Sequence, residues 1–179
     1  MRTFRIPSAL HDVFGERQSA ASLTLIALAM PVAVLAALPA FLTVEPWRAV
    51  LAGLLVADIA AGAIANFTRS TNDHYAASAL RRTVFLVVHV HIFVVALLLD
   101  LPIIPALVAW ALTIAAATAV VLLKATGLQR PVAGMGVVVV LGATAMTPEA
   151  TMVLLFMTAL FAIKVVLAFA IDHSADTGP

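Results

Sequence analysis

Residues 21–43 have the sequence ASLTLIALAMPVAVLAALPAFLT, which contains no ionisable side chain. A helix needs about 20 predominantly apolar residues to cross the hydrocarbon core of a bilayer, so this stretch is long enough to span a membrane. The rest of the chain is similar, because its 179 residues are 64% hydrophobic and only 11% charged. A water-soluble domain is about 45–50% apolar and about 25% charged. We therefore expect an integral membrane protein.

The composition also excludes several other classes of protein. The low charge and the low content of proline and glycine argue against a disordered or collagen-like chain. The absence of cysteine rules out disulfides, thiol chemistry and cysteine-ligated metals. A formal charge of +1 gives no general attraction to nucleic acid, so the expected partners are the lipid bilayer and either further copies of the chain or a larger membrane complex.

Six apolar stretches predict an all-α bundle of six transmembrane helices. The first is expected to remain uncleaved, because residues 38–40 (LPA) form a poor signal-peptidase site. The fifth is short and contains three glycines, so five spans with a re-entrant fifth segment is the alternative. The stretches are 21–43, 47–67, 83–101, 103–123, 131–146 and 150–171.

Basic residues predict the orientation, because lysine and arginine favour cytoplasmic loops. With the N-terminus inside, the outer loops hold only Arg48, and an even number of spans places both termini in the cytoplasm of a cell-membrane protein. The outer loops are short, so we expect function inside the bundle or at its inner surface. The basic residues on the inner side are Arg2, Arg5, Arg17, Arg69, Arg81, Arg82, Lys124 and Arg130.

Two segments lie outside the single transmembrane domain of residues 21–171. The apolar positions of residues 1–20 approximate a helical stripe, which predicts an amphipathic cytoplasmic helix on the inner membrane surface. Residues 172–179, beginning with Asp172, are expected to form a solvated cytoplasmic tail.

Asp58 lies near the middle of the second predicted span. It begins a small, polar stripe with Gly62, Asn66 and Ser70 at steps of four residues, and such positions share one helix face. Ionisable groups inside a membrane are costly and are functional candidates. The stripe is either a path for a solute, an ion or a proton, or a packing seam around a protonated Asp58.

Three more ionisable residues lie away from the ends of the predicted spans. His89 and His91 are two residues apart, about 200° around a helix, so their rings should not reach one metal ion and no metal site is expected. His89 is expected to face inward, and His91 is expected to meet apolar neighbours as a neutral ring. Lys164 could pair with Asp58, but its apolar helix face favours extension toward the inner headgroups.

The stretch after the second span is the most polar part of the chain. Its arginines could hold a lipid headgroup or a phosphate, and its Asp and His could act in acid–base chemistry. The simpler alternative is a capped turn in which Asn72 or Asp73 begins a short surface helix. The candidate residues are Arg69, Asp73, His74, Arg81 and Arg82.

Missing motifs narrow the chemistry. No serine lies deep in a span, no second deep carboxyl accompanies Asp58, and no His-Glu-x-x-His motif occurs. These absences argue against serine, aspartic and zinc intramembrane proteases. We assign no catalytic residue, and the sequence implies no particular cofactor.

Three functions remain open. The favoured one is a non-enzymatic protein that binds or moves a small solute, an ion or a proton through a cavity lined by Asp58, Asn66, His89 and Lys164. The second is an enzyme acting on a lipid or polyprenyl phosphate at the inner interface. The third is an accessory subunit of a larger membrane complex.

Overall fold

The computed structural model describes residues 3–124 and 126–174, and the protein is mostly helical (76%). The elements in chain order are β1 (Thr3–Arg5), η1 (Ser8–Leu10), α1 (His11–Phe14), β2 (Arg17–Ser19), α2 (Ala20–Phe41), α3 (Pro46–Ala65), α4 (Arg69–Ala76), α5 (Ala79–Val88), α6 (His91–Leu98), α7 (Ile103–Leu122), α8 (Gln129–Ala145), α9 (Met152–Ala162) and η2 (Ile163–Phe169), the last being a π-helix.

The expected all-α fold, built on apolar helices long enough to cross a membrane, is confirmed. Within the described ranges, five helical segments are long and apolar enough to cross a bilayer: α2, α3, α5 with α6, α7, and α9 with η2. The sixth apolar helix, α8, has 17 residues. A crossing by α8, and with it the count of six spans, stays a prediction.

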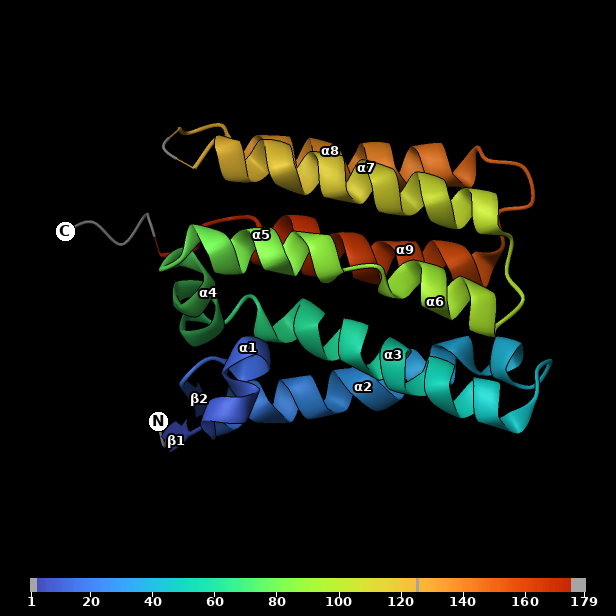
Figure 1. Cartoon of the computed structure of the whole chain (residues 1–179), viewed down its shortest axis with the longest axis horizontal. Helices are drawn as coiled ribbons and strands as arrows, with labels where there is room; N and C mark the ends of the chain where they lie inside the picture. The colour runs from blue at the N-terminus through green and yellow to red at the C-terminus, as the bar shows by residue number, and fades with distance from the viewer. Residues whose placement is uncertain (1–2, 125, 175–179) are drawn as a thin grey trace.

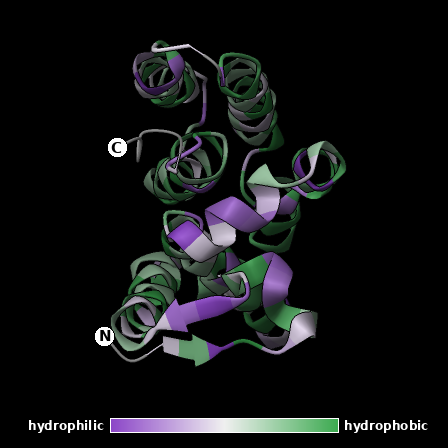
Figure 2. Ribbon diagram, turned by 90° about the vertical axis from the view of Figure 1, so that its left-hand side faces the viewer, coloured by the Kyte–Doolittle hydropathy of each residue, from purple (hydrophilic) through white to green (hydrophobic). Residues whose placement is uncertain are grey.

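The long helices lie side by side in the bundle (Figure 1). α2 packs on α3, α7 packs on α8, and α9 with η2 contacts helices of both pairs. We call the end that carries β1, β2 and α4 the hairpin end, and the opposite end the short-loop end. Figure 2 looks onto the hairpin end, where the hydrophilic ribbon is concentrated in front of mostly hydrophobic helices.

Local sequence explains where several helices begin. The Ser19 hydroxyl accepts a hydrogen bond from the amide of Ser22 at the start of α2, and Thr151 does the same for Leu154 at the start of α9. Such caps satisfy amides that have no partner inside the helix. Pro46 stands in the first turn of α3, where its missing N–H costs no helical hydrogen bond.

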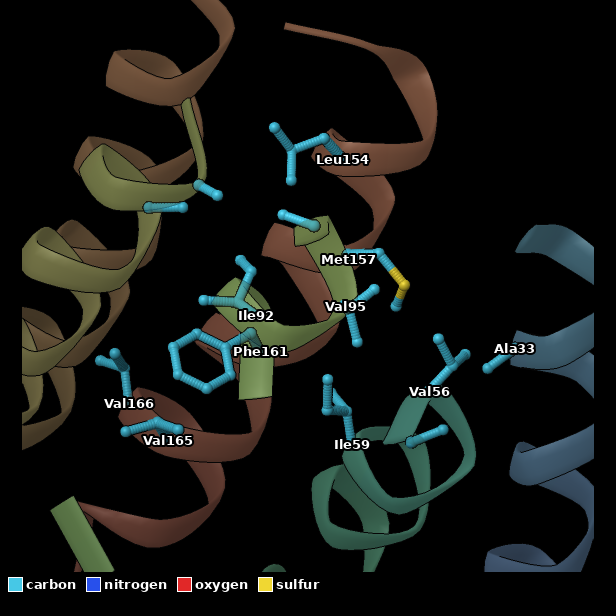
Figure 3. Packing of buried hydrophobic residues seen from close by; sticks show 14 of the residues in the cluster. Ala33, Val56, Ile59, Ile92, Val95, Leu154, Met157, Phe161, Val165 and Val166 are labelled. Carbon is cyan, nitrogen blue, oxygen red and sulfur yellow. The ribbon is translucent and has the colours of Figure 1, made fainter. Parts of the chain in front are cut away.

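An apolar core fills the bundle between α3, α6 and α9 (Figure 3). Its side chains include Val56, Ile59, Ile92, Met157 and Phe161, each fully buried. Large apolar side chains also cover the outside, among them Leu25, Leu28, Val32 and Leu35 on α2, all more than half exposed. Soluble monomers rarely expose apolar patches of this extent, so lipid is the expected solvent of this surface.

Small residues on α2 and α7 allow close helix packing. Ala33 and Ala37 of α2 are buried where this helix packs on α3. Ala109, Thr113 and Ala117 of α7 are completely buried where α7 packs on α8 and η2. Small side chains let helix backbones approach one another, so both stripes serve packing.

The predicted amphipathic helix over residues 1–20 is wrong for the described part of that segment. β1 and β2 instead form an antiparallel hairpin with Phe4 opposite Gln18, and only the short helices η1 and α1 lie between them. Gln18 donates hydrogen bonds to the carbonyl of Phe14 (2.6 Å) and the hydroxyl of Thr68 (2.7 Å). The contact with Thr68 ties this segment to the bundle.

The tail expected from residue 172 onward is not solvated at its start. Asp172 is buried and forms an ion pair with Lys124 at 2.9 Å, while the amide of His173 donates to Asn72 at 3.0 Å. The expectation is therefore wrong for these two residues, because Lys124 and Asn72, from other parts of the chain, bind them. The rest of the tail, residues 175–179, lies outside the described residues.

Candidate functional site

The third predicted span is interrupted between its two histidines (Figure 1). α5 ends at Val88, and His89 leaves helical geometry with φ −80° and ψ 67° before α6 begins at His91. The indole nitrogen of Trp110 donates to the carbonyl of His89 at 3.1 Å. This contact satisfies an acceptor near the interruption, since backbone groups within a membrane must find partners in the protein or in water.

The interruption brings the two histidine rings together. Their centroids are 5.0 Å apart, and Nε2 of His91 lies 3.9 Å from Oδ2 of Asp58. The prediction that His91 faces apolar neighbours is wrong, because the 200° separation holds only for a continuous helix. His89 does face the interior and is buried.

The buried Lys164 forms an ion pair with the partly exposed Asp58. Its Nζ lies 2.8 Å from Oδ2 of Asp58, and only 4% of the residue is exposed. The prediction that Lys164 extends to the headgroups is therefore wrong. Desolvated charges favour a partner of opposite sign in the low-dielectric interior, and Asp58 is the carboxylate within reach.

Gly62 makes room for this lysine. A Cβ atom at Gly62 would collide with Cε of Lys164 and would lie 2.9 Å from its Nζ. One turn further along α3, the Asn66 amide donates to the carbonyl of Lys164 at 3.4 Å. The polar stripe along α3 thus contacts both the side chain of Lys164, at Gly62, and its backbone carbonyl, at Asn66.

A cavity of about 110 Å³ lies beside this ion pair. The Asp58 side chain is 40% exposed, in contrast to that of Lys164. Three of the predicted path residues, Asn66, His89 and Lys164, share the cavity with Asp58. The cavity is lined by Asp12, Val13, Asp58, Gly62, Asn66, Tyr75, Phe85, His89, His91 and Lys164.

Two ring nitrogens at the cavity lack hydrogen-bond partners within the described part of the chain, namely Nε2 of His89 and Nδ1 of His91. Nδ1 of His89 lies 2.5 Å from the carbonyl of Phe85, so it is the donor, and Nε2 is the acceptor of a neutral ring. Buried polar atoms are normally paired. Water or a ligand that forms hydrogen bonds with these two nitrogens would therefore be favoured at this position.

A second groove adjoins the cavity on the side of the hairpin end. A groove of about 400 Å³ along α5 shares Asp12, Tyr75, Phe85 and His89 with it and extends to Arg81. On the other side of the ion pair, the apolar core of Figure 3 fills the bundle toward the short-loop end. The groove thus leads from Arg81 to the residues that border the polar cavity.

The N-terminal segment covers this route. The Tyr75 hydroxyl donates to the carbonyl of Asp12 at 2.6 Å, and Nε2 of His74 lies 3.1 Å from Oδ1 of Asp12. Burial and the charge of Asp12 raise the pKa of Tyr75, so its hydroxyl remains a donor. Sequence reasoning missed Asp12 and Tyr75; Tyr75 is the single tyrosine within the polar stretch already singled out, whereas nothing marked Asp12.

The predicted headgroup residues do not converge on one point. Four of them, Arg69, Asp73, His74 and Arg81, line a surface pocket of about 510 Å³. Within it Arg69 lies 3.5 Å from Asp73, and Arg81 donates to the carbonyl of His74 at 3.0 Å. Arg82 lies elsewhere, in a groove between α5 and α7.

The predicted cap of the short helix is wrong as well. Thr68 precedes α4, and Asn72 and Asp73 lie inside it. Asn72 is buried, and its amide donates to the carbonyl of Ile171 at 2.8 Å. Tertiary contacts to the end of the chain, rather than local capping, therefore occupy this asparagine.

Within residues 3–124 and 126–174, no group of three or more His, Cys, Asp or Glu side chains is placed to hold a metal ion. Comparisons with protein-family models, curated proteins and solved structures find no match to this chain.

Proposed function

We propose that this protein binds and moves a proton, an ion or a small solute through the cavity around Asp58. One observation carries the proposal: an Asp58–Lys164 ion pair borders a cavity that is also lined by His89 and His91, and each of these rings has a buried nitrogen without a partner among the described residues. A buried ion pair is often no more stable than an apolar replacement. Stability alone therefore gives little reason to place these charges inside the bundle.

The size of the cavity limits what it can hold. A water molecule occupies about 30 Å³ of liquid volume, so about 110 Å³ suits a few waters, a proton relay, a single ion or a solute of few heavy atoms. Asp58 would carry the charge or the proton and Lys164 would be its counter-ion. His89 and His91 would exchange protons with the water or ligand between them.

Two irregular helical segments border the cavity and would allow it to open toward the short-loop end, where the apolar core fills the bundle. One is the interruption at His89, and the other is the π-helix η2 that carries Lys164. π-Helical turns and broken helices recur at functional and transport sites. In this proposal the two segments act as joints, and the apolar core toward the short-loop end repacks when they move.

The setting of this activity is also part of the proposal. The arginines of the described hairpin end, such as Arg17 and Arg69, favour a cytoplasmic location for that end. If α8 crosses the bilayer, both termini lie in the cytoplasm, and the cell membrane is the proposed location.

The test is flux into vesicles that contain the purified protein. Proton entry is followed with a trapped pH-sensitive dye, and cation entry with trapped indicators. The combined Asp58→Asn and Lys164→Gln variant keeps the net charge of the pair at zero and should lose flux by tenfold or more. Asp73→Asn, which neutralises an exposed carboxylate outside the cavity, is the matched control and should retain flux.

The proposal fails if the parent protein transports none of the offered ions, or if the double variant matches the parent. Circular dichroism and size-exclusion chromatography would establish that each variant is folded.

A second candidate function rests on the surface pocket at the hairpin end. Arg17, Arg69 and Arg81 line it together with Asp73 and His74, a composition that suits a lipid or polyprenyl phosphate. This candidate predicts the opposite result for the control, because Asp73→Asn would then abolish activity on the phosphate substrate while the cavity variant retained it.

A further inference from the structure

A second large groove lies on the other side of α5, between this helix and α7. Its volume of about 770 Å³ is within the range of small-molecule sites. Leu86, Val87, Ile114 and Val121 give it an apolar lining, and Arg82 and Lys124 lie at its hairpin end. The groove therefore combines a long apolar section with a basic end.

Arg82 is the unusual residue of this groove. It is only 6% exposed, and its Nε donates to the carbonyl of Tyr75 at 3.4 Å. Its two terminal nitrogens, Nη1 and Nη2, have no hydrogen-bond partner among the described residues. A buried guanidinium without acceptors is costly. A ligand that offers oxygen acceptors to Arg82 would therefore be favoured at this position.

The neighbouring charges leave a positive excess. Lys124 pairs with Asp172 at 2.9 Å. Burial raises the pKa of Asp172, but the hydrogen bond and charge of Lys124, with a smaller contribution from Arg82, hold it below its usual range. Among residues 3–124 and 126–174, one ionised carboxylate thus faces two cations, which leaves an excess of one positive charge at the basic end of the groove.

We propose that this groove binds an anionic phospholipid, with the phosphate at Arg82 and Lys124 and an acyl chain along the apolar section between α5 and α7. The charge of such a lipid matches the excess of one, and its phosphate oxygens suit the unpaired guanidinium nitrogens. The bilayer that surrounds these helices supplies the ligand directly. This site is separate from the Asp58 cavity and does not depend on the function proposed for it.

Trp110 offers a direct measurement, because it lines the same groove. The protein is placed in phosphatidylcholine nanodiscs that contain a minority of brominated lipid, either phosphatidylglycerol or phosphatidylcholine. Bromine quenches nearby indoles, and a Trp47→Phe background removes the other tryptophan. Titration should show that brominated phosphatidylglycerol quenches Trp110 at about tenfold lower mole fraction than brominated phosphatidylcholine, as expected for charged hydrogen bonds.

Variants connect this preference to the basic end. Arg82→Gln should abolish it, whereas Arg81→Gln, which changes the exposed neighbouring arginine, should not. Lys124→Met is a second variant with a different structural role, because Arg82 can then balance Asp172 and the positive excess disappears. Equal quenching by the two lipids in the parent would overturn the proposal, and so would a preference that persists in both Arg82→Gln and Lys124→Met.

Discussion

The ammonium nitrogen of Lys164 lies 2.8 Å from a carboxylate oxygen of Asp58, although the two residues are 106 positions apart in the chain. The two ends of this contact differ in their surroundings. The Lys164 side chain is 5% exposed, whereas that of Asp58 is 40% exposed. Loss of one partner should therefore have unequal effects, depending on which charge remains.

Asp58→Asn should destabilise the protein more than Lys164→Met. The first change leaves a buried ammonium without its partner, and such a loss costs about 3–5 kcal/mol. The second leaves a carboxylate with access to the cavity. The combined Asp58→Asn and Lys164→Met variant should regain most of the lost stability, as measured by thermal unfolding in detergent. Equal losses from the single changes would contradict this account of the pair.

Gly62→Ala should disturb the same contact without changing any charge. The new methyl group would lie 2.9 Å from Nζ of Lys164, and overpacking of this kind costs about 1–3 kcal/mol. Gly53→Ala is the matched control on the same helix, because its Cβ would meet nothing within 4 Å. That control should be neutral or stabilising by up to about 1 kcal/mol, and thermal unfolding compares the two variants.

Gly15→Ala should loosen the N-terminal segment from the bundle. Gly15 has φ +68°, and an added Cβ would lie 2.5 Å from two atoms of Ser70 and 2.6 Å from a third. The hydroxyl of Ser70 accepts a hydrogen bond from the Arg17 amide at 3.0 Å. Hydrogen exchange across residues 3–19 should accelerate in this variant, while Gly127→Ala, which meets nothing within 4 Å, should leave it unchanged. Parent-like protection in Gly15→Ala would show that this glycine does not hold the segment in place.

The Lys124–Asp172 pair should make stability depend on pH in the acidic range. The lowered pKa of Asp172 means that the pair stabilises the fold above the pKa of an unfolded aspartate, about 3.9. This contribution is lost as the pH falls through the still lower pKa of the folded state. Lys124→Met should therefore cost about 1 kcal/mol at neutral pH, and its melting curve should approach that of the parent as the pH drops below about 3.9. A difference that persists unchanged under acid conditions would point to lost packing instead.

The sequence predicted the membrane class because apolar length and composition are properties of each segment alone. It also identified Asp58, Asn66, His89 and Lys164, which the structure places around one cavity. The roles of His91 and Lys164 could not be read in the same way. Val88-His89-Val90 contains no glycine or proline, so nothing local marks the interruption, which coincides with a contact from Trp110 on another helix.

The other errors have a similar origin. Whether Lys164 reaches a headgroup or Asp58 depends on how η2 lies against α3, and a single helix face contains no such information. The burial of Asp172 depends on Lys124, which follows α7, and on Gln129, the first residue of α8. Asp12 was missed for the same reason, because its importance comes from Tyr75 and His74 on α4.

The order of the Asp58–Lys164 pair along the chain has a consequence for biosynthesis. Protein chains emerge N-terminus first, so α3 leaves the ribosome before η2 has been translated. A lone carboxylate is expensive in hydrocarbon, and the nascent helix would therefore insert with Asp58 as the neutral acid or wait near the bilayer surface. Docking of η2 then becomes the final assembly step, and a nascent chain that stops short of Lys164 would expose a defect that quality-control proteases can recognise.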